Sequence, residues 1–339
     1  MNKIKIGKKY LSNNEVFFII EEGNVAWGDF NKAKKMIKIA SETGADAIEF
    51  QLARVDEFYK KSEPAYKIWK ELEYSNDQIK ELIELANSNN LEFIAAPLSV
   101  SIIKFLAEQG CSAFNINASD ITNPQIIDAV VSTGLPFFLS LPLATEEEIN
   151  WAIARINDNA KNNLILLLGQ HPMASGHHGV EISDMNLGYI NTLKNQFNCL
   201  VGFIDHSPLI WTPALAIASG ACVITKHLAI SRSEKSSDWQ ICLEPDEMKD
   251  SVNIVRYAKE SLNAKNKRVA VGENMDRSIM RRSILSARNI SIGKIIEIDD
   301  LVFKRPGIGI PPSDFELLLG KKAKKNLNED EILNINDFE

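Results

Sequence analysis

The sequence predicts an α/β fold, a (β/α)8 TIM barrel followed by a small C-terminal domain. Short apolar runs alternate with amphipathic helical patterns through residues 16–263 of the 339-residue chain. The runs are continuously apolar, which is typical of parallel strands buried on both faces. Strand–helix repeats over about 250 residues match a (β/α)8 barrel. A doubly wound open sheet is the alternative, but no Gly-x-Gly-x-x-Gly motif follows the first run.

Each predicted element rests on its own local pattern. The eight predicted strands span residues 16–21, 46–51, 92–97, 113–117, 136–141, 163–169, 200–205 and 221–227. Amphipathic helices are predicted between them, among them 31–43, 76–87, 124–132 and 146–156. Thr145 and Glu148 are spaced as a capping box, which marks the start of the last of these helices.

The chain changes character after residue 263, which predicts a second domain. Residues 1–263 form the predicted barrel, residues 264–280 a linker and residues 281–339 a separate C-terminal module. Short segments broken by turns, such as the one around Pro306 and Gly307, predict little regular structure there. A module of this size forms a marginal core alone, so we expect it to pack on the barrel or on a second subunit.

Composition excludes several classes of function. The net charge is −7 and 24% of residues are charged, with no basic stripe of the kind that binds nucleic acid. No apolar stretch reaches the ~18 residues that span a membrane, and the N-terminus has no signal-peptide pattern. The four cysteines show no paired spacing, so we expect reduced thiols and a cytoplasmic protein.

Two histidines end consecutive predicted strands in the same way. His206 follows the run 200–205 and His227 ends the run 221–227. Carboxyl ends of parallel barrel strands meet at one rim, where catalytic residues of such barrels lie. Imidazoles suit Mn²⁺, Fe²⁺, Co²⁺ or Zn²⁺ better than Ca²⁺, and such an ion polarises carbonyl groups. A lone histidine at the end of a strand is more often structural. Because the pattern occurs twice, a metal-binding role and a structural role are equally favoured for this pair.

Other polar residues are expected at the same rim. They are Glu21, Glu49, Gln51, Asn115, Asp120, Ser140, His171, Asp205 and Lys226. For Glu21, a role in acid–base catalysis and a role in a salt bridge are both possible from the sequence. Asp205 is as consistent with a structural role as with a functional one. The adjacent His177 and His178 lie on a predicted loop, where exposure to solvent is the more common outcome.

Three stretches resemble the sialic acid synthase family, whose members make N-acetylneuraminate, legionaminate and pseudaminate. They are 201–207 around His206, Lys226–His227 followed by Asp238 and 243–245, and the C-terminal segments 281–284, 304–310 and 319–323. The resemblance covers about residues 15–337. It implies a (β/α)8 barrel with a C-terminal antifreeze-like (SAF-type) domain. It also implies metal-dependent condensation of phosphoenolpyruvate with an N-acyl sugar aldehyde.

The resemblance also implies roles for individual residues. His206 and His227 become ligands of a divalent metal, Mn²⁺ before Mg²⁺ or Co²⁺. Glu21, Gln51, Asp120 and Asp238 become catalytic residues. Arg305 would enter the sugar pocket of the partner subunit in a domain-swapped homodimer. Asn123, Ser140 and His171, at or beside the predicted rim, are further candidates for binding substrate.

Some positions depart from the family. Glu49 and Asn115 stand where the family carries two lysines that hold the phosphate and carboxylate of phosphoenolpyruvate, and Ala118 replaces a serine. One charge pair at ~4 Å is worth about 4 kcal/mol at an effective dielectric near 20. These changes therefore predict a thousandfold or greater loss in donor affinity, which Arg54, Lys226 or His171 would have to offset. Two alternatives follow, a relative that uses another donor and a non-catalytic sugar-binding paralogue.

Overall fold

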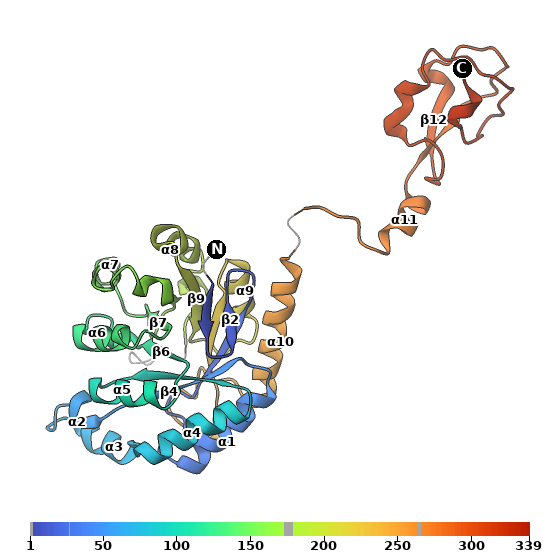
Figure 1. Ribbon diagram of the computed structural model, residues 1–339. Helices are drawn as coiled ribbons and strands as arrows, with labels where there is room; N and C mark the ends of the chain where they lie inside the picture. Colours follow the sequence, from blue (N-terminus) through green and yellow to red (C-terminus); the bar gives the residue numbers. More distant parts are fainter. Residues whose placement is uncertain (1–2, 27, 173–178, 264–265) are drawn as a thin grey trace. The chain divides into compact units, whose positions relative to one another are not determined.

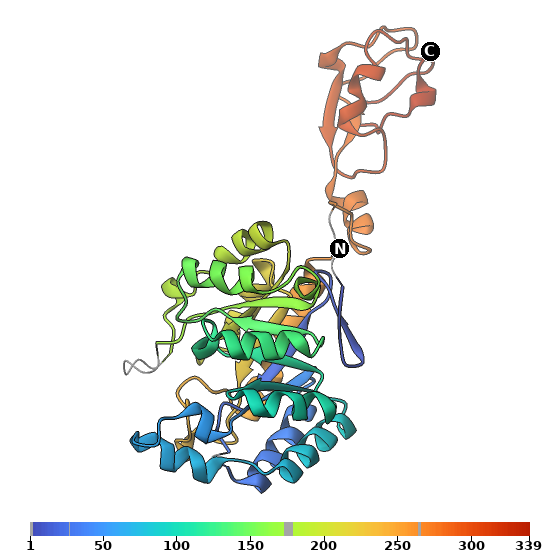
Figure 2. The same ribbon diagram turned by 60° about the vertical axis from the view of Figure 1, so that its left-hand side comes forward.

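The chain folds into two compact units, which are described separately. The computed structural model describes residues 3–26, 28–172, 179–263 and 266–339. The units are Met1–Asn263 and Ala264–Glu339. The first is a closed barrel of parallel strands with helices packed around it (Figures 1 and 2).

The barrel strands follow one another in chain order. They are β3 (Phe17–Glu21), β4 (Ala47–Leu52), β5 (Glu92–Pro97), β6 (Ala113–Ile116), β7 (Phe137–Ser140), β8 (Leu164–Leu168), β9 (Leu200–Asp205) and β10 (Val223–His227). The helices are α1 (Phe30–Glu42), α2 (Val55–Phe58), α3 (Pro64–Leu72), α4 (Asn76–Ser88), α5 (Val100–Glu108), α6 (Pro124–Ser132), α7 (Glu146–Arg155), α8 (Tyr189–Phe197), α9 (Thr212–Ala218) and α10 (Pro245–Ser261).

The predicted barrel is confirmed and the open sheet is wrong. The deciding contact is between the last and the first barrel strands, since β10 pairs in parallel with β3 and places His227 opposite Glu21. An open sheet would leave both strands unpaired on one side. The predicted capping box is also present, because Glu148 N donates to Thr145 Oγ1 at 3.3 Å and Thr145 N donates to the Glu148 carboxylate at 2.8 Å.

A short hairpin that the sequence patterns did not predict covers the N-terminal end of the barrel. Strands β1 (Ile4–Ile6) and β2 (Lys9–Leu11) pair antiparallel. Ile4, Ile6 and Leu11 join the apolar side chains of the barrel interior. Lys9 also bonds to Asp46, just before β4, at 2.8 Å. The opposite end of the barrel, where the strands finish, is therefore the end available for a site.

The second unit has more structure than the sequence predicted. Helix α11 (Glu273–Met280) lies in the range expected to be a linker. Strands β11 (Ser283–Ser286) and β12 (Leu301–Lys304) pair antiparallel. The unit has its own apolar core, made by Ile284, Ile290, Ile296, Leu301, Leu318, Ala323, Leu327, Leu333 and Phe338. Across both units, the described helices include none with the length and apolar character needed to cross a membrane.

Candidate functional site

An open cavity lies at the carboxyl ends of the barrel strands. Its lining residues come from most of the barrel strands or from the loops that follow them. They are Glu21, Asn24, Gln51, Phe58, Trp69, Leu98, Asn115, Asn117, Ala118, Ser119, Ser140, Pro142, Leu143, His171, Ile204, His206, His227, Ser237 and Asp238. The structure therefore brings together seven of the predicted site residues, Glu21, Gln51, Ser140, His171, His206, His227 and Asp238.

The two strand-end histidines face one another in this cavity. His206 directly follows β9 and His227 ends β10, and their ring centroids are 5.1 Å apart. His171 makes an edge contact with His206, with ring centroids 4.7 Å apart. His206 and His227 are 3% and 2% exposed, so both rings are held inside the protein. Burial lowers the pKa of His206, and the neighbouring His227 and His171 lower it further, which favours a neutral imidazole.

Glu21 joins the histidine pair because the barrel closes in register. Its Oε2 lies 3.5 Å from His227 Nε2. Its Oε1 accepts a hydrogen bond from Gln51 Nε2 at 2.9 Å, and Gln51 Oε1 accepts one from Asn24 Nδ2 at 3.0 Å. Gly23, at φ +58°, passes so close to His227 that a Cβ there would lie 2.6 Å from the ring. We call Glu21, His206 and His227 the histidine side.

The histidine side presents buried donor atoms of the kinds that bind divalent metals. His206 Nδ1, His227 Nδ1 and Glu21 Oε2 are buried and have no hydrogen-bond partner in the described part of the chain. Buried polar atoms are normally satisfied, so such groups need an explanation. Within that same part, no three His, Cys, Asp or Glu side chains converge closely enough to hold an ion by themselves. Two imidazoles with a nearby carboxylate fit a metal that keeps open positions for substrate.

A second group, which we call the amide side, connects three neighbouring strands at the same rim. Ser140 Oγ donates to Asn115 Oδ1 at 2.9 Å, and Asn115 Nδ2 donates to Glu49 Oε1 at 2.7 Å. Glu49 is fully buried. Burial raises its pKa well above the usual value, and the negative charge of Glu21 raises it further. Glu49, Asn115 and Ser140 therefore form a hydrogen-bonded chain, and Glu49 Oε2 has no partner in the described part of the chain.

No lysine or arginine lines the cavity among the residues that the structure describes. Lys226 points elsewhere, since its fully buried Nζ lies 3.0 Å from Asp205 Oδ2 and also donates to Ser207 O. Arg54 donates to Tyr74 O at 2.9 Å and bonds to Asn76. Of the three side chains considered as replacements for the missing lysines, the cavity thus includes His171 alone.

Two predicted residues, Asp120 and Asn123, lie away from the cavity lining. Asn123 Nδ2 donates to Asp120 Oδ1 at 2.8 Å, and Asn123 Oδ1 caps α6 by accepting from Gln125 N at 3.1 Å. Asp120 and Asn123 therefore fix a turn after β6 instead of facing the cavity. Arg305 belongs to the second unit, which is described by itself. His177 and His178 lie outside the described residues.

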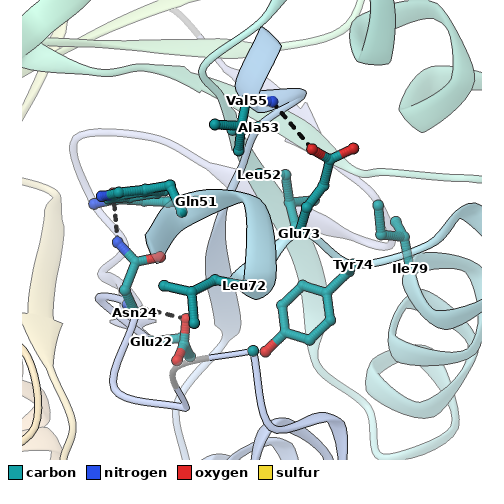
Figure 3. A pocket seen from close by; sticks show the side chains of 12 residues that line it. Glu22, Asn24, Gln51, Leu52, Ala53, Val55, Leu72, Glu73, Tyr74 and Ile79 are labelled. Atoms are coloured by element: carbon teal, nitrogen blue, oxygen red, sulfur yellow. Dashed lines mark hydrogen bonds between the residues drawn. The ribbon is translucent and has the colours of Figure 1, made fainter. Parts of the chain in front are cut away.

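A narrow pocket adjoins the main cavity and contains a buried acid (Figure 3). Asn24 and Gln51 line both. Glu22 accepts hydrogen bonds from Ala26 N at 2.5 Å and Asn24 N at 3.1 Å. Burial nevertheless raises the pKa of Glu22 to about 7. Glu22 thus orders the loop after β3 that carries Asn24 to Gln51.

Sequence reasoning missed several lining residues. Asn24, Phe58, Trp69, Ser119 and Ser237 lie in loops or in short helices after β4 and β6. For Ser119 a signal existed, because it lies two residues after the predicted strand 113–117. Phe58 and Trp69 gave none, since aromatic residues at helical spacing are more often core residues.

The comparisons with known proteins agree with this architecture. Residues 36–267 match the NeuB family and residues 281–339 match the SAF domain. The chain is 31% identical to the N,N'-diacetyllegionaminic acid synthase of Legionella pneumophila, over 94% of this chain and 93% of the relative. An uncharacterised protein of Methanocaldococcus jannaschii is 34% identical, over 100% of this chain and 99% of that protein.

A solved structure gives the same result. The N-acetylneuraminic acid synthetase of Leptospira borgpetersenii, determined with citrate, aligns with a TM-score of 0.73 and 30% identity. The alignment covers 81% of this chain and 94% of that one. The family match extends over more than half of the chain, and the barrel and the C-terminal domain are those that the sequence predicted. This chain therefore belongs to the NeuB family, with a SAF domain at its C-terminus.

Proposed function

We propose that this chain catalyses a metal-dependent aldol-type condensation. The donor is phosphoenolpyruvate or an analogous three-carbon compound, the acceptor is the aldehyde of an N-acyl sugar, and the product is a sialic-acid-like nonulosonate. The observation that carries the proposal is the meeting of Glu21, His206 and His227 at the rim, with three buried polar atoms left without partners in the described residues. Membership of a family of synthases supports the reaction class.

The proposed role of each side chain follows from its position in the cavity. His206 and His227 would hold a divalent ion, Mn²⁺ first and Mg²⁺ or Co²⁺ as alternatives, which when bound supplies a Lewis acid for the sugar aldehyde. Glu21 is placed to accept or return a proton, and the Gln51 amide fixes the orientation of its carboxylate. Asp238, Ser140 and His171 lie on the cavity wall, where they would contact substrate hydroxyls.

The homodimer and the cytoplasmic location are part of the proposal. Arg305 would reach the partner subunit's sugar pocket, and size measurement by light scattering tests the dimer. A monomer that retains full activity would remove the role of Arg305. The four cysteines are free and buried, which supports a reducing compartment.

The test is a product assay with the purified full-length chain. We expect a nonulosonate, detected by mass spectrometry, when Mn²⁺, a three-carbon donor and a panel of N-acyl hexosamines are supplied. Chelation of the metal should abolish product, and its return should restore it. Sugar binding without product from any donor would instead indicate a non-catalytic sugar-binding paralogue.

A further inference from the structure

We propose that the donor is a 2-oxo acid with a single negative charge, pyruvate, and not phosphoenolpyruvate. The inference rests on the proposed function, because it names the donor of that same condensation. It starts from the charges that surround the cavity. Two carboxylates, Glu21 and Asp238, are among the lining residues, and no lysine or arginine of the described chain accompanies them.

A phosphate monoester makes a demand that this cavity does not meet. It carries about −1.5 to −2 charges at neutral pH, and the carboxylate of phosphoenolpyruvate adds another. Proteins bind such groups with arginine, lysine or a cluster of backbone N–H groups. Here the positions that would supply cations hold Glu49 and Asn115, and Asn115 uses one amide hydrogen on Glu49 at 2.7 Å.

The nearest cations are committed elsewhere. Lys226 is fully buried in its pair with Asp205 at 3.0 Å, so moving it would strand a buried carboxylate. Arg54 bonds to Glu73, Tyr74 and Asn76 in another pocket. Neither lines the cavity, and within the described residues of the barrel unit no other lysine or arginine does.

The same wall suits a smaller, less charged donor. Asn115 and Asn117 place neutral amide groups on the cavity wall as donors for one carboxylate, while the Ser140 and Ser119 hydroxyls already donate to Asn115 and Asp120. Ala118 and Ile204 give the wall apolar surface beside them. A planar three-carbon acid with a methyl group matches this mixture of neutral polar and apolar groups.

The reaction balances without phosphate. A carboxylate of the cavity takes one proton from C3 of pyruvate, C3 forms a bond to the aldehyde carbon of the sugar, and the aldehyde oxygen gains one proton. No phosphate leaves and no water is consumed, whereas the phosphoenolpyruvate route consumes water and releases phosphate. The two donors are therefore distinguished by their products.

The experiment compares both donors with the full-length protein, Mn²⁺ and the same N-acyl hexosamines. We expect product from pyruvate at a rate at least hundredfold above that from phosphoenolpyruvate. In D₂O, deuterium should enter C3 of pyruvate, which NMR detects. Product from phosphoenolpyruvate with equimolar phosphate, at the pyruvate rate or faster, would overturn the inference and leave the proposed function standing. No product from either donor overturns both.

A charge-restoring variant tests the cause. Asn115→Lys, alone and combined with Glu49→Lys, should raise the affinity for phosphoenolpyruvate about a hundredfold in calorimetry. The single variant keeps the test interpretable where the double variant fails to fold. Asp158→Lys makes the same change of charge as Glu49→Lys, at a side chain that is 95% exposed, and it should leave donor affinity unchanged. Unaltered phosphoenolpyruvate affinity in folded Asn115→Lys would refute the charge argument.

Discussion

The histidine side and the amide side of the rim differ in what their polar atoms do. On the histidine side, the imidazole Nδ1 atoms and one Glu21 oxygen have no partner in the described chain. On the amide side, Asn115 bonds to both Ser140 and Glu49, and a single oxygen, Glu49 Oε2, has no partner in the described chain. Unsatisfied buried groups are costly unless a ligand completes them. The histidine side thus lacks partners that a bound ligand would supply, whereas most polar atoms of the amide side already bond to one another.

The largest effect should come from the histidine side. We expect His227→Ala to lower kcat/KM by about a thousandfold or more, because it removes a proposed metal ligand, whereas removing a mere support of a ligand typically costs 10- to 100-fold. Differential scanning fluorimetry should also lose its Mn²⁺-dependent rise in Tm. His171→Ala, beside the pair at 4.7 Å from His206, is the matched variant and should keep that rise. An unchanged Mn²⁺-dependent rise in Tm in His227→Ala would contradict the proposed metal site on the histidine side.

The ion pair beneath the histidines is expected to be the largest contributor to stability in this region. Lys226→Met should lower the free energy of unfolding by about 3–5 kcal/mol, because Asp205 would remain buried and charged without its cation. Urea denaturation measures the loss. The exposed pair Lys304–Asp330 provides the control, since Lys304→Met should cost about 0–1 kcal/mol. Equal losses in both variants would contradict a structural role specific to Lys226.

The raised pKa of Glu22, next to Glu21 in the chain, makes the free energy of unfolding depend on pH. Its folded-state pKa of about 7 lies above the ordinary 4.5, so its stabilising contribution is complete below pH 4.5 and is lost as the pH rises through 7. The expected loss is about 3 kcal/mol, from 1.36 kcal/mol per pKa unit. Urea unfolding from pH 4.5 to 8 should show a smaller decline in Glu22→Gln than in the parent. Parallel curves would contradict the buried, protonated Glu22.

The smallest of these effects belongs to the amide side. Asn115→Leu should lower the free energy of unfolding by about 1–3 kcal/mol, because Glu49 and Ser140 would each lose a buried hydrogen bond. Calorimetric melting measures it. Asn163→Leu, at a half-buried side chain with one exposed hydrogen bond to Gly134 O at 3.1 Å, serves as the control and should change less. A rise in the free energy of unfolding would show that these hydrogen bonds do not stabilise the fold, and would favour a role for Asn115 in binding substrate.

The sequence predicted the histidine side better than the amide side, and the reason is physical. His206 and His227 end apolar runs, and the barrel rule alone brings such residues to one rim. Hydrogen bonds between side chains have no signature in sequence. Asp120 shows the limit. Its position after a strand placed it at the rim and the resemblance implied a catalytic role, whereas Asn123 Nδ2 bonds to it at 2.8 Å in a turn. The hairpin before the barrel escaped notice because each of its strands is three residues long.

The closing contact between β3 and β10 also governs when the histidine side comes into existence. Glu21 is among the first barrel residues to be synthesised and His227 is in the last barrel strand, yet the two lie in register across the seam. A nascent chain that has reached β9 already holds Glu21, Gln51 and His206 but lacks His227 and has an open sheet edge. The proposed metal site is therefore completed by the same event that completes the domain, and an unfinished chain should not assemble it.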